Sequence, residues 1–134
     1  MGIRKVRKLV ASAMRDLEMG ERYARLKEDA VASLLYKKAR ERVLKALFMI
    51  RTKREPPVNV SERYLANKVR MPAEMSAELS TVEQEEDEID ESGETFVADS
   101  HQRHRLLSTA RNRISSRYRV TKRLIYYAMA SVKI

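Results

Sequence analysis

Apolar residues recur at helical spacing along the first fifty residues and fall on one face of a predicted helix. This pattern predicts one long helix, or two helices in line, through most of residues 3–54. Glu21 and Glu28 interrupt the apolar stripe, so we expect a bend or a change of packing partner between residues 18 and 29. Pro56 and Pro57 end the helix, because neither can continue it. The stripe consists of Ile3, Val6, Val10, Ala13, Met14 and Leu17, followed by Ala24, Val31, Leu35, Ala39, Ala46 and Ile50.

The middle of the chain predicts two shorter helices. Asn59 or Ser61 is a suitable N-cap for the first, and Pro72 suits the first turn of the second. The second helix has a thin apolar stripe and is expected to end near Ser92-Gly93, unless its acidic run, residues 83–94, frays into a loop. A short extended piece is possible over residues 95–98. The stripe of the second helix is formed by Met75, Leu79, Val82 and Ile89.

The last predicted helix covers residues 100–132, and Asp99 with Gln102 resembles a capping box at its start. Its apolar residues share one narrow face, and Arg and Lys occupy the opposite face. The chain has three Gly, three Pro and no pattern typical of a longer strand, so we predict an all-α fold in one domain, residues 1–134. The apolar face consists of Leu107, Ala110, Ile114, Tyr118, Ile125, Ala128 and Val132.

Charge divides this domain into three parts. The first helical part, residues 1–54, has 16 Lys or Arg and 6 Asp or Glu, a net charge of +10. Residues 55–99 have 3 and 13, a net charge of −10, and residues 100–134 have 9 and none, a net charge of +9. We therefore expect a basic helical arm over about residues 1–55, an acidic region of short helices over 56–99, and a basic amphipathic helix over 100–134.

Rows of Arg with neighbouring Ser, Thr and Asn are typical of phosphate binding, because guanidinium groups hold phosphate oxygens bidentately. Few aromatic residues are available for stacking on bases, so we predict contact with the backbone of double-stranded DNA and no sequence preference. The alternative is that the acidic middle neutralises the basic ends, within one chain or between neighbours. The candidate nucleic-acid-binding residues are Arg4, Lys5, Lys8, Arg15, Arg22, Lys37, Arg40, Arg111, Arg113, Arg117, Arg119, Lys122 and Arg123.

Enzymatic chemistry has little support in this sequence. There is no Cys, the three Gly are isolated, and His101 and His104 have no evident third metal ligand. We therefore expect no catalytic residue, metal or cofactor. The N-terminus is too charged for a signal peptide, and the longest apolar run, Leu124–Val132, is too short to span a membrane. A membrane-surface role for a basic amphipathic helix is a further alternative, although the narrow apolar face counts against a membrane as a direct partner.

The layout of the whole chain resembles the major coat proteins of filamentous archaeal viruses, namely rudiviruses, lipothrixviruses and tristromaviruses. The matching segments are MGIRKVRKLVASAMRDLEMGERYARLKEDAVASLLYKKARERVLKALF at the start and RNRISSRYRVTKRLIYYAMASV near the end. This resemblance implies an all-α capsid protein whose protomers pair and wrap double-stranded DNA, held in A form, inside a helical filament. It also implies location in a virion assembled in the host cytoplasm, or otherwise in the cytoplasm. The acidic run would then face outward or meet a basic neighbour.

A second resemblance concerns LLYKKARERVLKAL, residues 34–47, which looks like the central helix of archaeal GINS replication-factor subunits. It implies a helical subunit of a replication complex instead of a coat.

We also expect the chain to associate, as a homo-oligomer or with another helical coat chain. An unbroken helix over residues 3–54 would be about 78 Å long. The remainder of the chain is too short to cover its apolar stripe, so a partner chain would have to do so.

Overall fold

The computed structural model of this chain describes the backbone of residues 3–91 and 100–132, and the side chains of residues 3–82 and 113–132. These residues form five helices and no strand, which confirms the all-α prediction for the described part of the chain. The extended piece predicted over residues 95–98 and the capping residue Asp99 lie outside the described residues. The helices are α1 (Ile3–Arg25), α2 (Asp29–Thr52), α3 (Glu62–Val69), α4 (Ala73–Glu91) and α5 (Ser100–Val132).

The N-terminal helical region is a hairpin and not a rod. The chain turns at residues 26–28, where Lys27 adopts a left-handed conformation with φ 62°. The backbone N–H groups of Leu26 and Glu28 both donate to the carbonyl of Tyr23, at 3.1 and 2.9 Å, and close the turn. The prediction of one helix or two in line over residues 3–54 was therefore wrong in its geometry, although nearly all of these residues are helical. The break falls after Arg25, within the interval 18–29 where a bend was predicted, while α1 runs without interruption through Gly20.

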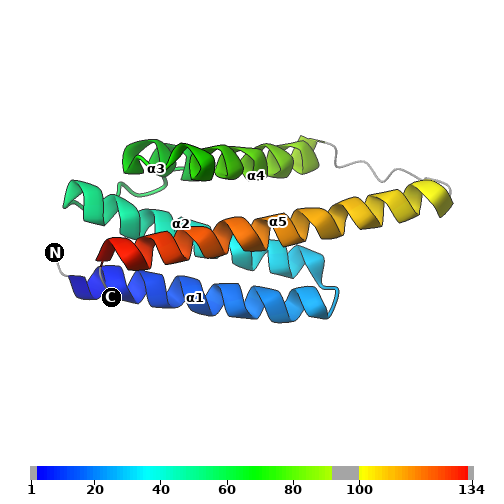
Figure 1. The fold of residues 1–134 in the computed structure, drawn as a ribbon, viewed down its shortest axis with the longest axis horizontal. Coiled ribbons are helices and arrows are strands. Elements are labelled where there is room, and N and C mark those ends of the chain that lie inside the picture. The colour runs from blue at the N-terminus through cyan, green and yellow to red at the C-terminus, as the bar shows by residue number, and fades with distance from the viewer. Residues whose placement is uncertain (1–2, 92–99, 133–134) are drawn as a thin grey trace.

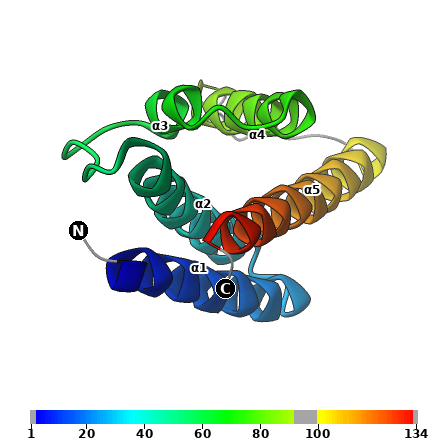
Figure 2. The same ribbon diagram turned by 60° about the vertical axis from the view of Figure 1, so that its left-hand side comes forward.

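Helices α1 and α2 lie side by side and antiparallel, and α5 passes across α2 and also packs on α1 (Figure 1). Helix α1 begins and α5 ends at the same end of the molecule, whereas the N-terminal part of α5 extends beyond the other helices (Figure 1). Helices α3 and α4 form a further layer, in which α3 packs on α2 and α4 packs on α5 (Figure 2). The core therefore lies between α1, α2 and α5, with α3 and α4 above it.

The apolar stripe of α1 is covered within the chain itself. Val6, Val10, Ala13 and Leu17 are all buried, as the sequence pattern predicted, whereas Ile3 at the end of the helix is 55% exposed. The opposing surfaces come from α2 and α5. The argument that a partner chain must cover this stripe is therefore wrong, because the hairpin turn brings α2 back along it.

Gly20 allows α1 to approach α2 closely. A Cβ atom at this position would lie 2.5 Å from Cε1 and 2.8 Å from Cδ1 of Tyr36, so the ring of Tyr36 packs directly on the backbone of α1. On its other side the ring meets Tyr118 of α5 edge-on, with ring centroids 5.8 Å apart. Burial raises the pKa of the Tyr36 hydroxyl to about 12, and the nearby charge of Glu21 adds to this effect. Tyr36 thus joins three helices at one point.

The shorter helices follow their sequence signals. The hydroxyl of Ser61 accepts a hydrogen bond from the N–H of Tyr64 at 3.1 Å, so Ser61, and not Asn59, caps α3. Pro72 directly precedes α4, and its carbonyl accepts from the N–H of Ser76. Helix α4 packs on α5 through the buried side chains of Leu79 and Val82, both of which belong to the predicted stripe.

Helix α5 buries a wider face than its sequence pattern predicted. Ile114, Ile125 and Ala128 are buried as expected, and Val120 and Leu124 are buried as well. Because α5 contacts α1, α2 and α4, a single narrow stripe is not enough to describe its packing. Leu107 and Ala110 of the predicted stripe lie where side chains are not described.

Candidate nucleic-acid interface

The outward face of α1 presents four basic side chains in a row. Arg4, Lys8, Arg15 and Arg22 follow one another at spacings of four and seven residues, which places them on one face of the helix. The buried residues of α1 lie on the opposite face, and all four basic residues are exposed. From Arg4 to Arg22 the row extends about 27 Å at 1.5 Å per residue.

None of these four side chains forms an ion pair within the described residues. Two of the three acidic residues of α1 are paired with cations outside the row: Asp16 accepts a hydrogen bond from Arg42, and Glu21 accepts one from Arg25 at 2.7 Å. Glu18 is exposed close to the row and is the acidic residue of α1 that opposes its charge most directly. The outward face of α1 therefore has an excess of positive charge that the protein leaves in solvent.

Two further candidates are exposed but paired with acidic residues that lie outside their own helices. Lys5 of α1 donates to Glu55, which follows α2, and Arg123 of α5 donates to Glu78 of α4. The hydrogen bond and the charge of Lys5 lower the pKa of the Glu55 carboxyl below its ordinary value. The alternative that acidic residues neutralise basic ones thus holds for these positions. Both pairs are solvent-exposed, so each contributes little to stability.

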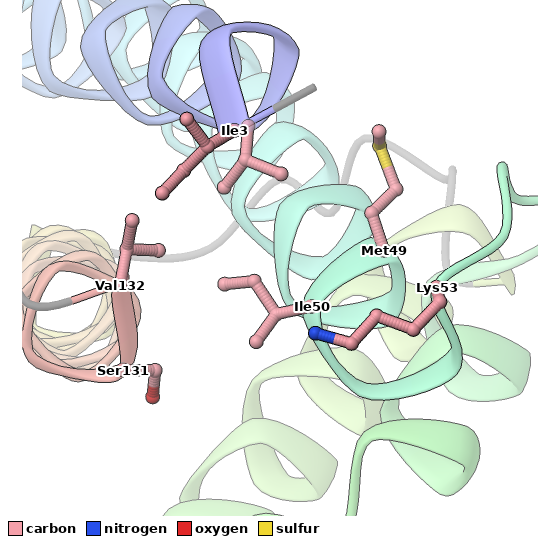
Figure 3. Close-up of a pocket in the computed structure, with 7 residues that line it drawn as sticks. Ile3, Met49, Ile50, Lys53, Ser131 and Val132 are labelled. Atoms are coloured by element: carbon pink, nitrogen blue, oxygen red, sulfur yellow. The ribbon is translucent and has the colours of Figure 1, made fainter. Parts of the chain in front are cut away.

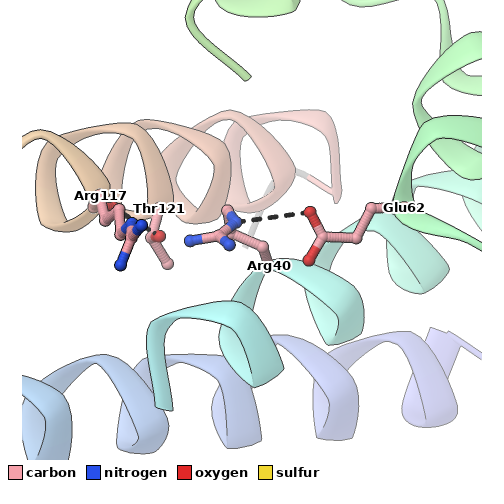
Figure 4. A network of polar contacts seen from close by, with 4 residues as sticks. All are labelled: Arg40, Glu62, Arg117 and Thr121. Atoms are coloured by element: carbon pink, nitrogen blue, oxygen red, sulfur yellow. Dashed lines mark hydrogen bonds and ion pairs between the residues drawn. The ribbon is translucent and has the colours of Figure 1, made fainter. Parts of the chain in front are cut away.

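Arg40 and Arg117 were wrong as candidates for nucleic-acid contact, because both are buried in the core at 0% and 4% exposure. Arg40 of α2 donates through Nε to Glu62 of α3, at 3.5 Å. Arg117 of α5 donates through Nη1 to the hydroxyl of Ser33 on α2, at 2.6 Å. Figure 4 shows Arg40 and Arg117 between α2 and α5, with Glu62 reaching toward Arg40. These guanidinium groups connect helices and cannot reach a duplex.

The remaining candidates differ in exposure. Lys37 and Arg119 are exposed and form no ion pair within the described residues, and Arg113 is partly buried. The ammonium group of Lys122 lies 5.6 Å from the ring centroid of Tyr118 and 5.8 Å from that of Tyr126, so cation–π contacts hold it. The side chain of Arg111 lies outside the described residues.

Sequence reasoning missed two acidic residues that decide which cations are paired within the protein. Glu62 and Glu78 pair with Arg40 and Arg123 across 22 and 45 residues of chain, so no local spacing indicates these partners. Arg7, which is exposed on α1, was missed as well. A helical projection of α1 alone would have found Arg7, because it turns away from the apolar stripe.

Two grooves lie away from the outward face of α1. One, of about 460 Å³, lies where α1 begins and α5 ends; Figure 3 shows Ile3, Ile50 and Val132 around it, with Lys53 at its edge. Its lining is mainly apolar. The other, of about 610 Å³, lies between the α1–α2 turn and α5, and mixes basic, acidic and aromatic side chains, including Lys27 and Tyr118. In the second groove the cations Arg25, Lys27 and Arg119 share the lining with the carboxylates of Glu21 and Asp29, which offset part of their charge.

The described residues contain no group of three or more His, Asp or Glu placed to hold a metal ion. Among the described helices, none combines the length and the apolar character that crossing a bilayer requires. A comparison with known protein families, with curated proteins and with solved structures found no match to this chain.

Proposed function

We propose that this protein binds double-stranded DNA through the phosphate backbone, without reading its sequence, and that the outward face of α1 is the main contact. The supporting observation is the row of Arg4, Lys8, Arg15 and Arg22, which is exposed and free of ion pairs within the described residues. Over its length of about 27 Å, one strand of a duplex presents about eight phosphates at 3.4 Å each. A rigid helix therefore offers several cations over one stretch of backbone.

The packing of α1 supports the same proposal. Its opposite face is fixed on α2 and α5 by Val6, Val10, Ala13 and Leu17, so the basic row is held on a folded scaffold. Less conformational entropy is then lost on binding than with a disordered basic tail. Arg40 and Arg117 are buried and connect helices, whereas the row on α1 is exposed and connects none. This contrast indicates that the row is not needed for folding.

The test replaces Arg4, Lys8, Arg15 and Arg22 together with Gln. Gln is a good helix former, so the fold should persist. Binding to unrelated duplexes is measured at several salt concentrations by fluorescence anisotropy. Affinity should fall to a similar extent on every sequence, and the slope of log affinity against log salt should become shallower by up to about 3.6, at about 0.9 per phosphate contact.

The control replaces Lys53, Arg54, Lys68 and Arg70 with Gln, which removes the same charge from the two residues that follow α2, from α3 and from the residue that follows α3. All four are exposed, and Lys53 and Arg70 are left-handed positions that Gln tolerates as well as the native residues. This variant should retain most of the affinity and of the salt slope. Equal losses in both variants would reduce the effect to net charge and contradict the assignment to α1.

We further propose that the chain is a structural protein that coats duplex DNA in a helical filament, most simply as the capsid protein of a filamentous virion. The resemblance in layout to archaeal viral coat proteins supports this, as does the part of α5 that extends beyond the other helices, where a neighbouring subunit could pack (Figure 1). The hairpin of α1 and α2 replaces the long arm that the resemblance implied. Association with a second copy or another helical chain remains part of the proposal.

Electron microscopy of the protein mixed with long linear DNA tests the coat proposal. Regular filaments with duplex in the lumen would support it. Discrete particles without DNA, or co-purification in a defined complex with replication proteins, would favour the GINS-like alternative. Salt-sensitive binding to anionic vesicles but not to DNA would favour a membrane-surface role.

A further inference from the structure

A small crevice between α4 and α5 has the size and the donors of a site for one phosphate group. It encloses about 180 Å³ and is lined by Glu78, Thr81, Ser116, Arg119, Val120 and Arg123. The four α5 residues follow the i, i+3, i+4, i+7 spacing, so they share one face of that helix. The crevice thus presents two guanidinium groups and two hydroxyl groups toward a common space.

The Glu78 carboxylate lies in this crevice and accepts a hydrogen bond from Nη1 of Arg123. A carboxylate and a phosphate present oxygens of the same kind to a guanidinium fork. The carboxylate therefore marks a position that a phosphate oxygen could take. Arg119 lies one turn before Arg123 in α5. It forms no ion pair within the described residues and is available for a second contact.

The ion pair is accessible to an incoming anion. The side chains of Arg123 and Glu78 are 58% and 35% exposed, so solvent screens their attraction and the pair opens at little cost. Helix α4 itself need not move, because Leu79 and Val82 hold it on α5 through other side chains. Glu78 has only to change its rotamer for Arg123 to be released.

We infer that the α4–α5 crevice is an oxyanion site for a backbone phosphate, formed by Arg119 and Arg123, and that Glu78 is an internal competitor for it. This inference rests on the proposed binding of duplex DNA and adds a second, regulated contact to the row on α1. In the free protein Glu78 neutralises Arg123. A phosphate that reaches the crevice displaces the carboxylate, so the acidic region weakens binding to DNA without covering the row on α1.

The first experiment measures duplex affinity of Glu78→Gln against Glu74→Gln. Both changes remove one negative charge from α4, but Glu74 is exposed and forms no ion pair within the described residues. Glu78→Gln should raise affinity about two- to five-fold at low salt, the range expected for loss of one exposed competing pair. It should also steepen the salt slope by about 0.9, the value for one added phosphate contact. Glu74→Gln should have a smaller effect on both.

A double variant tests whether Arg123 mediates the effect. In an Arg123→Gln background, Glu78→Gln should raise affinity no more than Glu74→Gln does, because the released cation is absent. Thermal unfolding of each variant checks that the fold is retained. Equal gains from Glu78→Gln and Glu74→Gln, or a gain from Glu78→Gln that persists without Arg123, would overturn the inference.

Titration with inorganic phosphate separates this inference from the proposed function. In Glu78→Gln, the side-chain Nε–Hε NMR signals of Arg119 and Arg123 should shift at lower phosphate concentrations than in the wild-type protein. This measurement needs no DNA, so it decides on the crevice even if the wild-type protein proves not to bind a duplex. Identical titrations of the two proteins would refute the competition by Glu78, while loss of DNA binding in the α1 variant would still support the proposed function.

Discussion

Replacing Gly20 with Ala should destabilise this protein, although Ala is the better helix former. In an open helix the change would stabilise by about 1 kcal/mol. The φ angle of Gly20 is not positive, so the backbone conformation at this position accepts a side chain without strain. The destabilisation comes from packing, because the new Cβ would lie 2.5 Å from Cε1 and 2.8 Å from Cδ1 of Tyr36.

The ring of Tyr36 has little space to move away from a side chain at position 20. It is 1% exposed and meets Tyr118 edge-on at 5.8 Å, so relief requires α1 and α2 to separate or the ring to leave its rotamer. Overpacking of this kind costs about 1–3 kcal/mol. After subtracting the gain in helix propensity, we expect Gly20→Ala to lower the free energy of unfolding by about 1 kcal/mol.

The same substitution should stabilise a variant in which the ring is absent. In a Tyr36→Val background the Cβ at position 20 no longer meets the ring, so the helix propensity of Ala should raise the free energy of unfolding by about 1 kcal/mol. The coupling between the two positions is then about 2 kcal/mol. Urea unfolding of the four proteins, followed by circular dichroism, measures it. A gain in stability from Gly20→Ala in both backgrounds would refute the close packing of α1 on Tyr36.

Two further predictions concern buried polar groups. Glu62→Gln should lower the free energy of unfolding by about 3 kcal/mol, because it removes the carboxylate beside the buried Arg40. Glu55→Gln breaks the exposed pair with Lys5 and should lower it by less than about 1 kcal/mol. Urea unfolding of both variants checks this, and equal losses would contradict the difference in burial. The raised pKa of Tyr36, about 12, means that the folded state keeps a proton which the unfolded state releases from about pH 10 upward. This contribution to stability is present below pH 10 and is lost as the pH rises toward 12, so Tyr36→Phe should lose less stability over that range, as measured by unfolding at several pH values.

Much of the secondary structure could be predicted from local sequence alone. The 3.6-residue periodicity of apolar positions determines where α1, α2, α4 and α5 lie, because one face of each must be buried. Ser61 caps α3 because its hydroxyl satisfies a free N–H of the first turn. The separation of the chain into basic and acidic parts is likewise a property of the sequence.

Only the tertiary structure decided how these helices meet and which charges remain exposed. The interrupted apolar stripe indicated a bend between residues 18 and 29, but it did not indicate that α1 and α2 fold back on each other. The turn depends on a single left-handed residue, Lys27, that is neither Gly nor Asn. The burial of Arg40 and Arg117, and the pairing of Arg123 with Glu78, join positions that are 22 to 84 residues apart. A helical projection shows that a cation lies on one face of its own helix. It cannot show whether solvent, the core or a carboxylate from another helix lies opposite, because that depends on contacts between segments distant in the chain.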